Sequence, residues 1–523
     1  MLILLIIFIL GFIVYLGIIT NFNVSYFFDI DLLILNSVNW LIKINWDYIS
    51  LGILLMLIIC FSYVYYYTHH YFSGDIAGFE LNKLICLFVA VMATLVCTGD
   101  FLSTLILWEY LGVVSFFLIL FYSNYLSLRS SIVTLVSSRF GDVCLFLLIG
   151  LMFFNNFTSW LSACLFFFII FTKSAGYPFI SWLLEAMRAP TPVSSLVHSS
   201  TLVAAGVWFA LRYDYYSYFE NTIIYSVLFL LTILITGICC FFFLDLKKIV
   251  ALSTCNNISW CMIYLLFGDV CLCLFQLLSH GVSKCMLFML VGDVMSGSGG
   301  SQASNCVYST RLYGNLGIFG LFSIILGLSG APFIGVFCTK HFFLSLFSGF
   351  TNILLLIFIC LCVFLSYFYS FRLCHILINI EYSLAAGVLY TFNAGLMVYM
   401  WLFINFYLGS IIDENNFILS EISIFLILSQ LVCCWTAYFL YQNNIFSKWS
   451  SSLFGCDNIV EYVYNIWISL NQYVSICFYR WDNNLLSIIR LSGNNTLYLY
   501  SVSVLNILIF GIFAVTILYG IVY

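Results

Sequence analysis

Long apolar segments recur along the whole chain and limit its fold more than any other feature. Of the 523 residues, 64% are hydrophobic and only 7% are charged, whereas about 25% are charged in soluble domains. Because a helix needs about 20 apolar residues to cross a bilayer, the sequence predicts an all-α polytopic membrane protein rather than a water-soluble globule. About 15 transmembrane helices are expected, at residues 2–20, 48–67, 82–98, 100–122, 129–153, 159–183, 190–212, 222–243, 247–267, 270–292, 314–347, 351–374, 384–409, 418–441 and 499–521.

Basic residues agree with this arrangement of segments. Lys and Arg favour loops on the side from which helices insert. When successive loops are assigned to opposite sides, only Lys43 and Arg212 fall away from the N-terminal side. The pattern fits an odd number of spans with an internal N-terminus. The basic residues on that side are Lys83, Arg129, Arg188, Lys247, Lys248, Arg311, Arg372, Lys448, Arg480 and Arg490.

The 21 cysteines are scattered through apolar segments without a Cys-x-x-Cys pair. Buried thiols of this kind behave as small hydrophobic groups, so we expect neither a metal site nor a structural disulfide. Residues 1–20 lack a basic start and a small-residue cleavage site, which favours a retained helix over a signal peptide. The many Phe, Tyr, Cys and Leu residues suit the thymine-rich codons of organellar genomes.

Three lysines lie inside apolar segments and indicate an ion path. Lys173, Lys284 and Lys340 sit inside stretches otherwise built mainly from Leu, Ile, Phe and Val, and a charge at bilayer depth costs about 2.5 to 3.5 kcal/mol. Such residues persist where a wet or paired interior uses them. The chain's only prolines lie near two of these lysines and near His198, and each proline removes a backbone donor and breaks or starts a helix. They are Pro178, Pro190, Pro192 and Pro332.

Two acidic residues are candidates for the same path. Glu109 lies three residues before Gly112, where a neighbouring helix could approach closely, and it is a natural partner for a buried lysine. Arg139 and Asp142 are three residues apart, a spacing that allows them to pair on one helical face. A structural pair and a conducting role are both open for these two residues.

Histidines complete the set of candidates. His198 follows a proline-broken helix and has hydroxyl side chains around it, so it is well placed to relay protons near neutral pH. His280 and Lys284 are four residues apart on one helical face. By contrast, Asp245, Lys247 and Lys248 are expected to form an exposed face of a loop.

Two features describe the larger organisation. Gly176–Tyr–Pro–Phe–Ile180 recurs as Gly330–Ala–Pro–Phe–Ile334 after five expected spans, and an odd number of spans between copies means inverted topology. Polar residues recur every three or four positions in residues 444–495, which indicates an amphipathic helix along the membrane surface.

Seven motifs occur in the order seen in one known family. The chain resembles the antiporter-like membrane subunits of the proton-pumping NADH:ubiquinone oxidoreductase, respiratory complex I, and among them the subunit-five family. The resemblance is strongest over about residues 45–375. The motifs are Trp108–Glu109, Arg139-x-Gly–Asp142, Lys173–Ser–Ala, Pro190–Thr–Pro–Val–Ser, His198–Ser–Ser–Thr, His280-x-x-x-Lys284 and Gly335-x-Phe-x-x-Lys340.

The resemblance implies antiporter-like inverted five-helix repeats with broken helices and a role for each buried charge. Glu109 and Lys173 would form an interacting ion pair, and His198 would act as a bridge. Lys284 would be the central proton carrier and Lys340 would lie near the exit. The supporting residues would be Arg139, Asp142, His280 and His341.

The resemblance also implies the setting of the chain. It would be a subunit of an H⁺-translocating NADH:ubiquinone reductase in the mitochondrial inner membrane, or alternatively in a bacterial inner membrane. It would bind no cofactor or metal, because NADH, FMN, iron–sulfur clusters and ubiquinone are used in other subunits. Expected partners are antiporter-like subunits four and two, accessory subunits and lipids such as cardiolipin, with no nucleic acid.

Five parts are expected along the chain. They are N-terminal transmembrane helices (1–81), an antiporter-like proton-translocating core (82–375), C-terminal transmembrane helices (376–443), a lateral amphipathic helix (444–495) and a terminal transmembrane anchor (496–523).

Several positions depart from the family pattern. Gln276 stands where many relatives have a histidine, His341 follows Lys340 where an aspartate is usual, and Arg188 replaces an acidic or small residue. The main alternative is the large subunit of a multisubunit sodium/proton antiporter, which shares the helical core. A purely structural subunit ranks last, because it gives the buried lysines no purpose.

Overall fold

A computed structural model gives the fold. It describes residues 26–35, 38–153, 160–213, 223–307, 309–310, 314–332, 336–347, 353–378, 382–383, 398, 401, 405, 420–440, 456–489 and 506–515.

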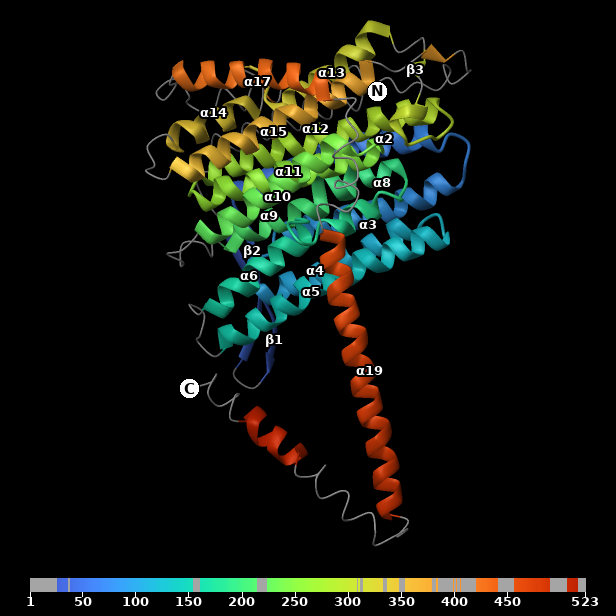
Figure 1. The fold of residues 1–523 in the computed structure, drawn as a ribbon, viewed down its shortest axis with the longest axis vertical. Helices are drawn as coiled ribbons and strands as arrows, with labels where there is room; N and C mark the ends of the chain where they lie inside the picture. Colours follow the sequence, from blue (N-terminus) through green and yellow to red (C-terminus); the bar gives the residue numbers. More distant parts are fainter. Residues whose placement is uncertain are drawn as a thin grey trace. The chain divides into compact units, whose positions relative to one another are not determined.

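Membrane-spanning helices dominate the part of the chain that the structure describes. Ten helical segments there are long and apolar enough to cross a bilayer, and Figure 1 shows them lying side by side from α4 and α5 at one edge to α17 at the other. One segment, Thr191–Tyr213, joins α8 (Thr191–Leu196), a π-helical turn η1 (Val197–Thr201) and α9 (Leu202–Tyr213). The others are α2 (Tyr48–Tyr71), α3 (Ala77–Val96), α4 (Phe101–Leu120), α5 (Tyr125–Phe153), α10 (Ile223–Phe242), α11 (Leu246–Leu266), α12 (Val270–Gly297), α15 (Ile353–Ile378) and α17 (Ser420–Leu440).

These ten segments confirm ten of the predicted spans. The predicted spans at 2–20 and 384–409 lie wholly or almost wholly outside the described residues. The last predicted span, 499–521, includes a shorter apolar helix, Asn506–Val515.

The two remaining spans are interrupted. Residues 159–183 form α6 (Trp160–Lys173), a break, and α7 (Ser181–Ala186). Residues 314–347 form α13 (Gly314–Ser329) and α14 (Val336–Phe347). Each first helix ends just before a residue in the left-handed region, Ala175 with φ 56° and Gly330 with φ 95°. The predicted breaks near prolines are therefore confirmed, whereas the inverted relation between the two halves stays a prediction.

The core of the bundle lies around α11, α12 and the Thr191–Tyr213 segment. The most apolar stretches of α11 and of Thr191–Tyr213 are buried along their whole length, and most of α12 is buried as well. α12 packs against α2, α8, α11 and α13. Since these central helices carry His198, His280 and Lys284, the fold holds those residues away from lipid.

A β-hairpin lies just before α2, and helical periodicity does not predict it. β1 (Tyr26–Leu35) pairs antiparallel with β2 (Val38–Trp46). The hairpin is joined to the start of α4 by hydrogen bonds from Asn45 N to Cys97 O (2.8 Å) and from Gly99 N to Lys43 O (2.8 Å). Two shorter strands, β3 (Ser309–Thr310) and β4 (Tyr382–Ser383), pair in parallel.

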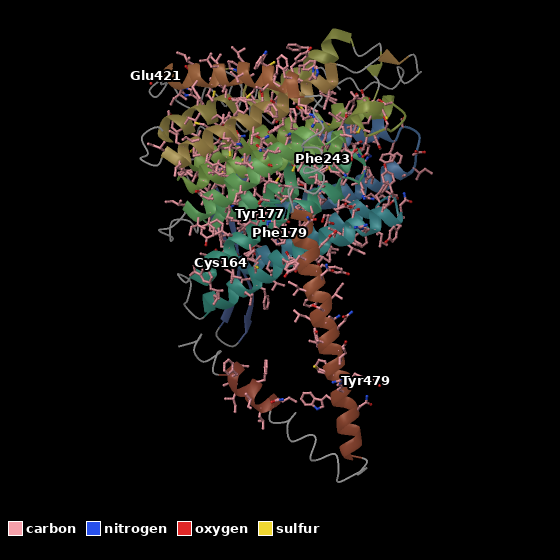
Figure 2. The ribbon with its side chains drawn as sticks, viewed as in Figure 1. Cys164, Tyr177, Phe179, Phe243, Glu421 and Tyr479 are labelled. Carbon is pink, nitrogen blue, oxygen red and sulfur yellow. The ribbon has the colours of Figure 1, made fainter. Side chains whose placement is uncertain are left out.

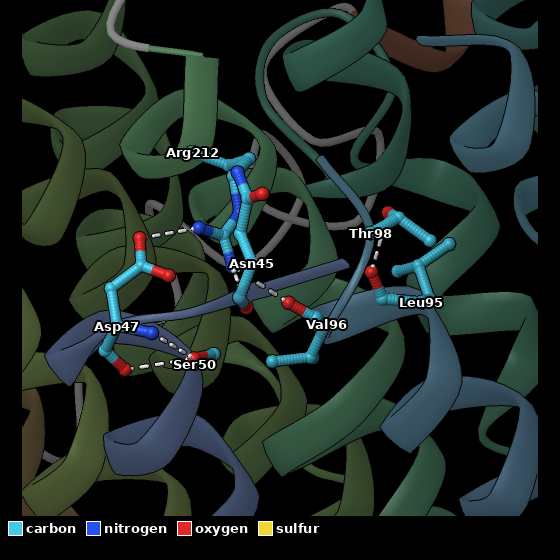
Figure 3. Close-up of polar contacts among 7 residues, drawn as sticks. All are labelled: Asn45, Asp47, Ser50, Leu95, Val96, Thr98 and Arg212. Atoms are coloured by element: carbon cyan, nitrogen blue, oxygen red, sulfur yellow. Dashed lines mark hydrogen bonds and ion pairs between the residues drawn. The ribbon is translucent and has the colours of Figure 1, made fainter. Parts of the chain in front are cut away.

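Arg212 fastens the end of α9 to this hairpin and to α2, as Figure 3 shows. Its guanidinium donates to Asp47 Oδ2 (2.5 Å) and to the carbonyl oxygens of Val96 (2.9 Å) and Asn45 (3.5 Å). Ser50 Oγ accepts from Asp47 N and donates to Asp47 O, both at 2.8 Å, which holds the first turn of α2. The arginine thus joins three separate segments.

The basic residues at the ends of the helices lie on the two sides of the bundle that the sequence predicts. Lys83, Arg188 and Lys248 lie where α2 ends and where α3, α8 and α11 begin; we call this end of the bundle the basic face. Contacts between Tyr67 and Thr191 and between His70 and Asp293 place the end of α12 there too. Lys43 and Arg212 lie at the opposite end.

The chain divides into two compact units, Met1–Asp457 and Asn458–Tyr523. Most of the described residues of the second unit belong to α19 (Cys456–Ile489), a 34-residue helix whose described side chains are exposed on all sides. The predicted helical character of residues 444–495 is confirmed for this stretch. The remaining domain boundaries stay predictions.

Candidate functional site

The break after α6 positions Lys173. The helix ends at this lysine, Ser174 Oγ donates to Ile170 O (2.7 Å), and Ala175 O accepts from Cys255 Sγ (3.0 Å). Figure 2 shows Tyr177 and Phe179, which flank Pro178 at the break. Because the chain stops following the helix here, the lysine projects into the bundle instead of along a continuous helical face.

Lys173 lies in a small polar cavity together with His198. The lysine is fully buried, and its Nζ has no hydrogen-bond partner among the described residues. Nζ lies 5.1 Å from the centre of the Trp108 ring, within the range of a cation–π contact. The cavity is small, with a volume of about 10 Å³, and is also lined by Ser115, Thr134, Ser137, Ser138, Thr172 and Trp182. Hydroxyl groups and an aromatic face therefore surround this cation.

Glu109 pairs with Arg139 rather than with Lys173. Arg139 Nη1 donates to Glu109 Oε2 and lies 3.6 Å from Asp142 Oδ2. The predicted Arg139–Asp142 pair is thus confirmed, while the expected Glu109–Lys173 ion pair is replaced. The reason is geometric: Glu109 and Arg139 lie on partly exposed faces of α4 and α5, whereas Lys173 is enclosed. Asp142, which is buried, is a carboxylate that interacts electrostatically with Lys173.

His198 lies in the π-helical turn between α8 and α9. Both ring nitrogens are buried and lack hydrogen-bond partners among the described residues. The neighbouring hydroxyls donate to backbone carbonyls of their own helix, Ser195 Oγ to Pro192 O (2.7 Å) and Ser199 Oγ to Ser195 O. Their oxygens retain lone pairs that can accept a proton donor. Single π-helical turns of this kind are frequent at functional sites.

Close packing at Gly206 holds the Lys173 break in place. A methyl group on residue 206 would lie 3.2 Å from Ser174 N and 3.3 Å from Ile170 O, which are backbone atoms. We expect Gly206→Ala to destabilise the protein by about 1 to 3 kcal/mol, as overpacking does. Thermal inactivation measures the effect. Gly150→Ala is the matched control, because a methyl group there meets nothing within 4 Å; equal stability of both variants contradicts this account.

Lys284 lies at the centre of the bundle. It is 2% exposed, and its Nζ donates to Ser253 Oγ on α11. His280, one turn earlier on α12, is fully buried, and neither ring nitrogen has a hydrogen-bond partner among the described residues. A second small cavity, with a volume of about 10 Å³, adjoins Lys284; its polar lining is Ser253, Asn257, Ser329, Tyr369 and Ser370.

Lys340 lies on the second half of the other broken helix. Its Nζ donates to Ser329 O (2.7 Å) and Ser366 Oγ (2.6 Å) and lies 4.3 Å from the centre of the Tyr367 ring. Ser329, the last residue of α13, also lines the Lys284 cavity. Ser329 therefore lies between the two lysines: the residue lines the cavity beside Lys284, and its carbonyl oxygen accepts from Lys340.

Two of the three departures from the family pattern, Gln276 and His341, lie close to Lys340 in sequence or in space. Gln276 Oε1 accepts from Thr339 Oγ1 (2.9 Å), which joins α12 to α14. His341 is buried against Phe337, with ring centres 6.0 Å apart, and its Nε2 has no partner among the described residues.

Sequence reasoning missed several polar partners of the lysines. Ser253, Ser329 and Ser366 lie on other helices, and nothing in their sequence spacing marks them. Lys247 was expected on an exposed loop but is 5% exposed, and its Nζ donates to Ala189 O (3.2 Å), just before Pro190. Its position beside an apolar helix start was the available signal. Lys248 and Asp245 are exposed, as expected, and they form an ion pair (3.3 Å).

The fold and the site together define a class of protein. A bundle with two broken helices, buried lysines on or beside the breaks, and polar cavities between them is an antiporter-like membrane subunit. Residues 98–366, just over half of the chain, match the family model described as "NADH:quinone oxidoreductase/Mrp antiporter, TM". The chain belongs to this NADH:quinone oxidoreductase/Mrp antiporter transmembrane family.

Curated relatives carry the name NADH-ubiquinone oxidoreductase chain 5. The Ascaris suum protein is 31% identical over 364 residues, covering 63% of this chain and 64% of that protein. The Artemia franciscana protein is 37% identical over 229 residues, covering 42% of each chain. The Aedes aegypti protein is 32% identical over 346 residues, covering 62% of this chain and 58% of that protein. The matched region thus spans less than two thirds of each of these relatives.

Two solved structures share the fold. The Mrp complex from Dietzia sp. aligns with a TM-score of 0.72 at 18% identity, covering 96% of this chain and 59% of that chain. The archaeal membrane-bound sulfane sulfur reductase aligns with a TM-score of 0.62 at 15% identity, covering 84% of this chain and 92% of that chain.

Proposed function

We propose that this chain is a core membrane-arm subunit of respiratory complex I. It translocates protons across the mitochondrial inner membrane, coupled to NADH oxidation and ubiquinone reduction elsewhere in the complex. The observation that carries the proposal is the placement of Lys173, Lys284 and Lys340, each at most 2% exposed, against polar groups from other helices. The curated relatives bear the name of such a subunit.

The buried residues suit proton transfer in sequence along the bundle. Lys173 and His198 share one cavity, and Ser329 lines the Lys284 cavity while its carbonyl accepts from Lys340. Burial disfavours the charged form of a lysine, and a nearby negative charge favours it. A buried lysine without a bonded carboxylate therefore gains or loses proton affinity when a nearby charge moves. The Glu109–Arg139–Asp142 group supplies fixed charges near Lys173, and Asp142 tunes the field there. His280 and His341 are titratable neighbours of Lys284 and Lys340.

Redox chemistry takes place outside this chain in the proposed function. NADH, FMN, iron–sulfur clusters and ubiquinone would bind to other subunits, and this chain would bind no cofactor. The described residues contain no group of three or more His, Cys, Asp or Glu side chains that could hold a metal ion.

Partners in the proposed complex are antiporter-like subunits four and two, accessory subunits and lipids such as cardiolipin. α19 supports this part of the proposal. At about 1.5 Å per residue its 34 residues reach about 50 Å, longer than a bilayer core is thick. Its exposed large side chains, including Tyr462, Trp467 and Tyr479, offer a surface for neighbouring subunits.

A second candidate is the large subunit of a multisubunit sodium/proton antiporter. The alignment over 96% of this chain with a chain of the Mrp complex favours it. The two candidates differ in one respect that is simple to observe, because only the first works in a redox-active assembly.

Native-gel separation of detergent-solubilised membranes distinguishes them. We expect mass spectrometry to find this chain in a very large band that stains for NADH dehydrogenase activity. Its presence only in an assembly without that activity contradicts the complex I proposal and favours the antiporter.

A further inference from the structure

One ion pair at the basic face joins two spanning helices. His70 Nε2 on α2 lies 3.5 Å from Asp293 Oδ1 on α12. The other ion pairs at that face, among the described residues, join positions three apart in sequence: Glu80–Lys83, Glu185–Arg188 and Asp245–Lys248. The His70–Asp293 pair is therefore different in kind, because it connects separate helices.

One partner of the pair is partly exposed and the other is buried. The His70 side chain is 26% exposed, whereas the Asp293 side chain is 3% exposed. The imidazole thus reaches the aqueous side while the carboxylate lies inside the bundle. A buried carboxylate is costly without a partner, and histidine is the side chain whose charge changes near neutral pH.

Hydroxyl groups from α2 and α8 pack against α12 at the residue before Asp293. Residue 292, next to Asp293, is a glycine, and a methyl group there would lie 2.6 Å from Tyr67 Oη and 3.2 Å from Thr191 Cβ. The glycine lets both side chains approach α12. Tyr67 Oη and Thr191 Oγ1 are 3.5 Å apart, at the outer limit of a hydrogen bond.

Thr191 is the first residue of α8, and this position connects the pair to the site. Thr191, Ser195 and His198 are spaced at i, i+4 and i+7, so they lie along one face of the helical run. All three are buried. His198 in turn lines the cavity that holds Lys173.

We propose that His70 and Asp293 form a proton-exchange site between the aqueous phase at the basic face and the path that begins at His198. This inference rests on the proposed proton-translocating function. His70 takes a proton from hydronium and leaves water; the imidazolium passes it to the Asp293 carboxylate and becomes neutral. The carboxylic acid then releases its proton to Tyr67 and becomes a carboxylate again. The Tyr67, Thr191 and Ser195 hydroxyls each give up one proton as they accept another, and the last proton is taken by a ring nitrogen of neutral His198.

Aromatic and hydroxyl side chains lie beside the pair. On α2, Tyr67 and Tyr71 are close, with ring centres 6.2 Å from His70 to Tyr67 and 5.9 Å from Tyr67 to Tyr71. His69 instead contacts Tyr65 and Phe79. From α8, the uncharged Thr191 contacts Tyr67.

The test uses the assembled complex in sealed vesicles and measures proton translocation per electron. We expect Asp293→Asn and His70→Gln, which keep shape and hydrogen bonding, each to slow translocation by about tenfold. Formic acid, a small proton carrier that reaches an exposed site, restores it. Glu80→Gln is the matched control, because this carboxylate belongs to an exposed pair at the same face and is expected to have no effect.

The outcomes separate the inference from the proposed function. If the unaltered complex translocates no protons, the proposed function fails. If it does, and both variants translocate normally, only the exchange site is refuted. If a variant is fully assembled but translocates slowly, and formic acid does not restore the rate, then His70 and Asp293 have a structural role. That result also overturns the inference. Asp293→Glu, which keeps the exchangeable proton, is expected to translocate normally and covers the case in which Asp293→Asn does not assemble.

Discussion

Replacing Lys284 with methionine is expected to leave the complex assembled but to slow proton translocation by about a hundredfold, the scale of a lost positioned proton carrier. Methionine has a similar length, and an apolar side chain in place of a buried charge is often neutral or stabilising for the fold. Ser253 loses only its bond to Nζ. Proton uptake by vesicles that oxidise NADH, compared with assembly on a native gel, measures both parts.

A second variant separates the proton from the charge. Lys284→Arg keeps a positive charge and a donor to Ser253, but a guanidinium does not release its proton in proteins. We therefore expect Lys284→Arg to assemble and to translocate protons as poorly as Lys284→Met. Lys83→Met is the matched control, because this lysine is exposed at the basic face. Normal translocation by the arginine variant would falsify the proton-carrying role of Lys284.

Removal of the Asp47 charge is expected to have the largest effect on stability. Arg212 is 3% exposed, and breaking a buried ion pair from one side costs about 3 to 5 kcal/mol, since the other charge stays buried and unpaired. Asp47→Asn keeps the side-chain shape and the two backbone bonds of residue 47 to Ser50. Thermal inactivation of the assembled protein measures the loss.

A double-mutant cycle tests whether the pair itself is responsible. We expect Asp47→Asn together with Arg212→Leu to lose less stability than the sum of the two single changes, since the uncompensated charge is then gone. Breaking the exposed Glu80–Lys83 pair by Lys83→Gln serves as the control and is expected to change stability by less than about 1 kcal/mol. Strict additivity at Asp47 and Arg212 contradicts the ion-pair explanation.

Local spacing predicted those parts of the site that lie on one helix. The Arg139–Asp142 pair follows from a three-residue separation, and the shared face of His280 and Lys284 follows from a four-residue separation. The breaks near Pro178 and Pro332 follow from the missing backbone donor of proline. In each case the physical cause acts within a few residues, so the sequence was sufficient.

Contacts between helices were harder to predict. Glu109 pairs with Arg139 because α4 and α5 pack together and leave both side chains near the surface, and this depends on how the helices are rotated. Lys247 is buried because its ammonium reaches Ala189, 58 residues earlier in the chain. Periodicity identifies the polar face of a helix but not the helix that covers it.

α12 differs from α6 and α13 in being continuous over 28 residues, and this has a mechanical consequence. Gln276, Lys284 and Asp293 lie on one stiff rod, with about 26 Å between the first and the last at 1.5 Å per residue. Their axial separations are therefore fixed. If α12 tilts or slides, all three residues move together. A change in the contacts of one residue but not of the others must therefore come from movement of the adjacent segments α2, α8, α11 and α14.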